Sequence, residues 1–153
     1  MSLLIATGSN LENPIHNLEL AKSLLCEKFE LIAASRIYRS AAVDYEAQPD
    51  FFNQVLEFKI PTHLTPDDVM EWLLKTELSL GRVRDISRGP RLIDLDIILW
   101  GLETHHTTLV DIPHPRWLER SFVIRPIQDL PFFKTIEKCF TIPMTFKIEA
   151  YAV

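Results

Sequence analysis

The stretch "RGPRLIDLDIILWG", residues 88–101, places two aspartates inside an apolar run. A short apolar segment closed by Gly101 predicts a strand over 91–101. Side chains two residues apart on a strand point to the same face, so Asp94 and Asp96 aim the same way, roughly 6 to 7 Å apart. At that distance two carboxylates repel by about 2 to 3 kcal/mol at an effective dielectric near 20. A cation that binds both would remove this cost.

Two interpretations of the aspartate pair stay open on the residues alone. The pair could bind Mg²⁺, which prefers carboxylate oxygens and substrate phosphates, or it could lie on the wet face of an edge strand. The surrounding cations favour a polyphosphate ligand, although each arginine could equally form a surface salt bridge. These cations are Arg82, Arg84, Arg88, Arg91, His114 and Arg120.

Periodicity along the chain predicts an α+β fold. Apolar runs, alternation and N-cap or C-cap residues predict strands at 2–8, 30–41, 51–60 and 91–101, and helices at 13–30 and 65–81. Alternation makes strand 51–60 half-buried, and 114–130 is expected to be helical before Pro126. The order β-α-β-β-α-β predicts a ferredoxin-like sandwich, with helices on one face of an antiparallel sheet, plus C-terminal additions. Segments 40–50 and 82–90 are long enough to form lids.

Composition narrows the possible functions. The 153 residues suit a single domain over 1–153, and 47% hydrophobic residues argue against disorder. A net charge of −5 without a basic cluster argues against a nucleic-acid partner. Because no signal peptide and no apolar run of roughly 18 residues is present, we expect a cytoplasmic protein without a membrane partner. Cys26 and Cys139 match no metal or redox spacing, and no Walker loop or G-x-S-x-G motif occurs.

The segment "GRVRDISRGPRLIDLDIILWG" (81–101) resembles the signature of the 6-hydroxymethyl-7,8-dihydropterin pyrophosphokinase family. Three further segments resemble family motifs in the right order: "GSNLENP" (8–14), "YRSAAVDYEAQPDFFNQV" (38–55) and "IPHPRWLERSFVIRPIQDL" (112–130). The resemblance covers about residues 3–130, and the tail 131–153 matches nothing we can place.

This resemblance implies a monomeric enzyme of tetrahydrofolate biosynthesis. The reaction would be Mg²⁺-dependent transfer of pyrophosphate from ATP to the hydroxymethyl group of the pterin, with release of AMP. The implied catalytic residues are Arg82, Arg91, Asp94 and Asp96, of which the two aspartates would bind two Mg²⁺ ions. The implied ATP-binding residues are Glu77, Arg84, Arg88, Ile97, Val110, Asp111, His114 and Arg120. The implied pterin-binding residues are Ser40, Ala41, Val43, Phe51, Asn53 and Phe122.

The chain departs from the family pattern in both predicted lids. The approach "DISRGPR" is one residue shorter than usual and lacks a tryptophan that often covers the pterin, and "SAAVDYE" replaces a Thr-Pro-Pro and Gly-rich turn. These departures motivate a second hypothesis, a non-catalytic pterin- or nucleotide-binding module. A third is a two-metal phosphodiesterase or nucleotidyltransferase, since paired aspartates also serve those reactions.

Overall fold

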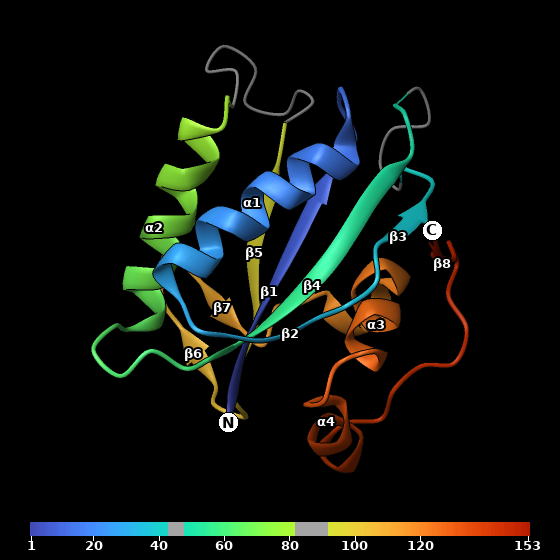
Figure 1. The fold of residues 1–153 in the computed structure, drawn as a ribbon. Helices are drawn as coiled ribbons and strands as arrows, with labels where there is room; N and C mark the ends of the chain where they lie inside the picture. The colour runs from blue at the N-terminus through green and yellow to red at the C-terminus, as the bar shows by residue number, and fades with distance from the viewer. Residues whose placement is uncertain (43–47, 82–91) are drawn as a thin grey trace.

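The computed structural model describes residues 1–42, 48–81 and 92–153. Five residues singled out from the sequence lie outside these ranges: Val43, Arg82, Arg84, Arg88 and Arg91. The whole of the predicted lid 82–90 and residues 43–47 of the predicted lid 40–50 also lie outside them. Within the described ranges, a central sheet lies between two long helices on one face and shorter C-terminal helices on the other (Figure 1). The α+β class predicted from the sequence is confirmed.

The central sheet is antiparallel at every pairing of its described strands. Its strand order is β5-β1-β4-β3-β8, and β2 also pairs with β4. The strands are β1 (Ser2–Ser9), β2 (Leu31–Ala34), β3 (Tyr38–Ser40), β4 (Phe51–Lys59), β5 (Asp94–Trp100) and β8 (Tyr151–Ala152). Strand β1, which opens the chain, therefore lies between β5 and β4, whose ends carry the predicted site residues.

Helices α1 (Pro14–Lys28) and α2 (Pro66–Ser79) cover one face of the sheet. Helix α2 begins with a capping box, in which the Thr65 side chain accepts from the Asp68 N–H and the Asp68 carboxylate accepts from the Thr65 N–H. The buried residues of these helices recur at helical spacing: Leu18, Ala21, Leu25, Val69, Met70 and Leu73. No helix in the described ranges is long and apolar enough to cross a membrane.

The opposite face is covered by the 3₁₀ turn η1 (Trp117–Glu119) and helices α3 (Ser121–Gln128) and α4 (Phe133–Cys139). Strand β4 is consequently buried on both faces from Asn53 to Phe58. The prediction of a half-buried strand was wrong, because residue patterns within β4 do not show that the C-terminal helices cover its second face. Even Glu57 is buried, and its carboxylate accepts hydrogen bonds from Ser2 Oγ at 2.9 Å and the Phe132 N–H at 3.1 Å.

Two further predictions about elements were wrong for local reasons. The strand expected over 30–41 is divided into β2 and β3, because Ser35 Oγ accepts the Val55 N–H at 3.0 Å and replaces a backbone acceptor. Helix α3 continues through Pro126 rather than ending before it. Proline has no N–H to donate, but burial of Val123, Ile124 and Ile127 against the sheet outweighs that loss.

A small hairpin, β6 (His105–His106) and β7 (Asp111–Ile112), lies beside the end of β5. Strand β5 is irregular there: Leu4 pairs with Leu99 and Ile5 with Ile97, so Ile98 is an extra residue. Such a bulge turns consecutive side chains to one side. Both Ile98 and Leu99 accordingly pack on the α3 face.

A cluster of hydrogen-bonded side chains, Arg36, Tyr38 and Asp129, joins the start of β3 to the end of α3. Asp129 accepts hydrogen bonds from Tyr38 Oη at 2.9 Å and from Arg36 Nη2 at 3.0 Å and N at 3.1 Å. Burial raises the pKa of Asp129, but the hydrogen bonds from Arg36 and Tyr38 outweigh burial and hold the pKa below its ordinary value of 3.8.

We predict that Asp129 stabilises the fold only while it is ionised. A carboxyl whose pKa is lower in the folded state contributes stability above its unfolded pKa and loses it as the pH falls through its folded pKa. The free energy of unfolding of the parent should therefore exceed that of Asp129→Asn at neutral pH, and the difference should shrink below pH 3.8. Chemical denaturation across this range measures it. Glu19→Gln on the exposed face of α1 is the control, and a difference independent of pH would contradict the prediction.

Candidate active site

The pairing register brings Asp94, Gly8 and Asn53 into one row across the sheet. Asp96, Ala6 and Val55 form the next row. Residues directly opposite each other in antiparallel strands project to the same face, and Val55 packs in the α3-side core. Both aspartates and Asn53 therefore project from the α3 face, separated only by Gly8 and Ala6.

These rows form the floor of a cleft of about 720 Å³. Nine of the residues predicted from the sequence line it: Ser40, Ala41, Phe51, Asn53, Glu77, Asp94, Asp96, Arg120 and Phe122. Four others that the structure describes are not among its lining residues: Ile97, Val110, Asp111 and His114. The cleft thus brings together the predicted pterin-binding side chains and the two aspartates.

One side of the cleft presents buried polar groups that lack partners. Within the described residues, neither Asn53 Nδ2 nor Ser40 Oγ has a hydrogen-bond partner, although both side chains are buried. A buried polar group without a partner costs free energy, so such groups indicate a place where a ligand donates or accepts. Asn53 Oδ1 lies directly over Gly8, where an added Cβ would approach it to 2.5 Å.

Aromatic side chains flank these polar groups. Phe51 opens β4 opposite Ser40, and Phe122 lies in the first turn of α3. The guanidinium carbon of Arg120 is 5.5 Å from the centre of the Phe122 ring. A planar ligand rich in hydrogen-bonding groups suits a cleft with aromatic faces and a polar edge.

The other side of the cleft carries the carboxylates. His114 Nε2 lies 3.4 Å from Asp96 Oδ2, while His114 Nδ1 accepts the Arg116 N–H at 3.1 Å. In the neutral ring the proton is therefore on Nε2, facing the carboxylate. The His114 N–H donates to the Ile98 carbonyl at 3.0 Å, which holds this loop against β5. No cluster of three or more His, Cys, Asp or Glu side chains that could hold a metal ion occurs among the described residues.

Glu77 lies at the outer edge of β5. Its buried carboxylate accepts the Leu95 N–H at 2.7 Å, so the Leu95 backbone faces away from β1. Backbone groups alternate along a strand, and those of Ile97 face the same edge. Val110 is buried beside this edge, and Asp111 in β7 faces solvent, where His106 Nδ1 is 3.1 Å from its carboxylate.

Comparison with protein families agrees with this geometry. The model of the 7,8-dihydro-6-hydroxymethylpterin-pyrophosphokinase family matches residues 4–131. The chain belongs to this family. The family predicted from the sequence is confirmed, and with it the enzyme class, an ATP-dependent pyrophosphokinase.

Proteins similar to this chain include bacterial pyrophosphokinases and a fungal protein of folic acid synthesis. The 2-amino-4-hydroxy-6-hydroxymethyldihydropteridine pyrophosphokinase of Bacillus subtilis is 38% identical over 82% of this chain and 75% of its own length. The protein of the same name from Pseudomonas aeruginosa is 36% identical over 82% of the chain and 78% of its own length. The Folic acid synthesis protein fol1 of Pneumocystis carinii is 39% identical over 82% of the chain, which corresponds to 17% of that longer protein.

Several residues that line the cleft were not predicted from the sequence. Gly8 had a usable signal, because a glycine within an apolar strand marks a close approach. Gln48 lies in the segment 38–55 that resembles a family motif, but it was not assigned to the site. Its side-chain oxygen accepts from Asn10 Nδ2 at 2.8 Å. Five more come from residues 116–121 and from the C-terminal tail: Arg116, Glu119, Ser121, Lys147 and Ile148.

We predict that Gly8→Ala weakens binding of a pterin by about tenfold, because the new methyl group would displace Asn53 Oδ1. Titration calorimetry of the variant with a pterin measures this. Combining Gly8→Ala with Asn53→Ala provides the control, since an effect transmitted through Asn53 must be non-additive. Additive losses would contradict the prediction.

Proposed function

We propose that this chain catalyses Mg²⁺-dependent transfer of pyrophosphate from ATP to the hydroxymethyl group of 6-hydroxymethyl-7,8-dihydropterin, with release of AMP, in tetrahydrofolate biosynthesis. The observation that carries the proposal is the row Asp94–Gly8–Asn53 across the sheet. It places a carboxylate side and a polar–aromatic side in one cleft, separated only by a residue without a side chain. A donor and an acceptor substrate could meet over Gly8.

The acceptor would bind on the Asn53 side. The free Asn53 amide and Ser40 hydroxyl would pair with the edge of the pterin, and Phe51 and Phe122 would contact its faces, with Ala41 and Val43 beside it. Pairing would remove the cost of two buried, unpartnered groups. The hydroxymethyl group would then point along the floor toward Asp94 and Asp96.

The nucleotide would bind on the carboxylate side. Asp94 and Asp96 offer oxygen donors on one face, the ligand type that Mg²⁺ prefers, and we propose that they hold two ions. When bound, these ions would neutralise the charge of the ATP phosphates. His114, Arg120, Arg84 and Arg88 would contact phosphates, Glu77 would lie near the ribose, and the backbone of Ile97, Val110 and Asp111 would contact the adenine.

The chain's own contribution to transfer would be positioning and charge. The acceptor oxygen would form a bond to the β-phosphorus of ATP while the bond from that phosphorus to the AMP oxygen breaks, and the hydroxyl proton would pass to solvent. Arg82 and Arg91, which precede β5, would stabilise the transferring group. A closed cleft over the sheet would exclude water, which would otherwise compete as the acceptor.

The strand order β5-β1-β4-β3 supports the ferredoxin-like arrangement as the framework of this reaction. We propose that the 153 residues act as one domain. The monomeric state, the cytoplasmic location and the lack of a nucleic-acid partner stay predictions from the sequence.

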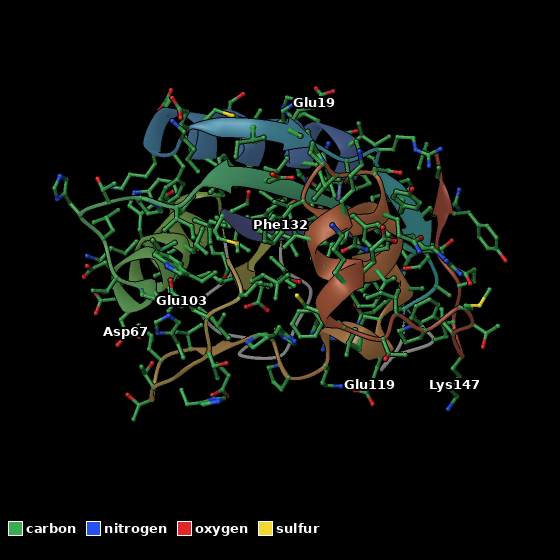
Figure 2. The ribbon with its side chains drawn as sticks, turned by 90° about the horizontal axis from the view of Figure 1, so that it is seen from below. Glu19, Asp67, Glu103, Glu119, Phe132 and Lys147 are labelled. Atoms are coloured by element: carbon green, nitrogen blue, oxygen red, sulfur yellow. The ribbon has the colours of Figure 1, made fainter. Side chains whose placement is uncertain are left out.

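We predict that Asp96→Asn lowers the rate of AMP formation by at least about 100-fold, because loss of a metal-binding carboxylate removes several kcal/mol of charge stabilisation. AMP release from ATP plus 6-hydroxymethyl-7,8-dihydropterin, followed with and without Mg²⁺, is the measurement. Glu19→Gln, on the far side of the molecule from Glu119 in Figure 2, is the matched control and should keep the parent rate.

The same assay separates the alternatives. A parent chain that binds both substrates but releases no AMP at any Mg²⁺ concentration would contradict the proposal and favour a binding module. Phosphodiester cleavage without a pterin would favour the two-metal phosphodiesterase.

A further inference from the structure

Residues 141–153, the last part of the C-terminal tail, lie outside the family match, which ends at residue 131. This part of the tail nevertheless returns to the cleft. Lys147 and Ile148 line the cleft together with Ser121 and Phe122 of α3. In Figure 2, Lys147 projects from the same margin of the molecule as Glu119, another lining residue.

Arg125 fixes the tail to α3. Its guanidinium donates to both carboxylate oxygens of Glu149, through Nε at 2.8 Å and Nη2 at 3.2 Å, and Nη2 also donates to the Met144 carbonyl at 2.9 Å. Its Cζ lies 5.1 Å from the centre of the Phe146 ring. A bidentate arginine–carboxylate pair is among the most directional polar contacts. About a quarter of each side chain is exposed, so solvent screens this pair less than a surface pair.

Two further contacts hold the tail, one within the span that Arg125 contacts and one beyond it. Ser121, one turn before Arg125 on α3, donates through Oγ to the Ile148 carbonyl at 2.5 Å. Beyond it, β8 pairs with β3, and the Val153 N–H donates to the Ile37 carbonyl at 2.9 Å. The tail therefore joins the helix that carries Phe122 to the strand that carries Ser40. These are two of the proposed pterin-binding residues.

We propose that residues 144–150 form a wall of the acceptor side of the cleft, and that Arg125 is a positioning residue which holds this wall, and with it Phe122, against the acceptor. The inference rests on the proposed function, because it assigns the acceptor to the Asn53 side. Arg125 touches no substrate in this arrangement. It acts through Glu149, Met144 and Phe146. The hydrogen bonds from Arg125 hold the pKa of Glu149 below its ordinary value, so the carboxylate stays ionised at neutral pH.

The test compares Glu149→Gln and Arg125→Gln with the parent, using titration calorimetry with 6-hydroxymethyl-7,8-dihydropterin and, separately, with a non-hydrolysable ATP analogue. We expect the dissociation constant for the pterin to rise by about fivefold or more, while that for the nucleotide changes by less than about twofold. The KM for the pterin should rise in the same way with kcat nearly unchanged, a split that general destabilisation would not give. Arg125→Lys, which keeps the charge but not the bidentate geometry, should recover part of the affinity.

Glu30→Gln is the matched control, because it breaks an exposed ion pair with Lys59 (3.0 Å), which ends β4 at the opposite end from Phe51 and the cleft. Hydrogen exchange of residues 144–153 shows whether the tail is released. If the tail is released but the pterin affinity is unchanged, residues 144–150 do not form a wall of the acceptor side. If the tail stays protected in both variants, Arg125 and Glu149 do not hold it in place. An inactive parent would contradict the proposed function instead, while the pterin titrations would still decide the role of the tail.

Discussion

The register of β1 between β4 and β5 is the constraint on which the site depends. Eight consecutive pairs join β1 to β4, and the same strand aligns Gly8 with Asp94 on its other side. A shift of one residue would turn every side chain of a strand to the opposite face. Asp94 and Asp96 would then point into the apolar core beneath α1 and α2, and Leu95 and Ile97 would occupy the cleft. The core and the cleft are therefore fixed by the same hydrogen bonds.

Much of this arrangement could be predicted from the sequence, because the signals were local. The i, i+2 spacing placed both aspartates on one face, and caps and periodicity identified the two long helices to within two residues at most ends. Asn53 could be assigned only through the family resemblance, since alternation alone suggests an ordinary exposed polar residue. The register with Gly8, which exposes Asn53 to the cleft, depends on residues 45 positions apart, and no local pattern encodes it.

What the sequence did not predict depends on long-range packing. The buried second face of β4, the continuation of α3 through Pro126 and the return of the tail all follow from apolar residues after position 117 that cover the sheet. Propensity disfavours a proline within a helix, but burial of several aliphatic side chains is worth more. The interruption between β2 and β3 at Ser35 also depends on long-range contacts. The Ser35 hydroxyl takes the place of a backbone acceptor because the Val55 N–H of β4 donates to it.

The Glu77 carboxylate has a consequence for self-association. Strand β5 is at the edge of the sheet, and an exposed edge is a template for pairing with another chain. The Leu95 N–H donates to the Glu77 carboxylate, and the Ile98 carbonyl accepts from the His114 N–H, so neither group is open to another chain. The Glu77 side chain and the His114 backbone, both in residues proposed to contact ATP, therefore protect the edge as well. A substitution at Glu77 would carry a risk of intermolecular strand pairing that is separate from any loss of nucleotide affinity.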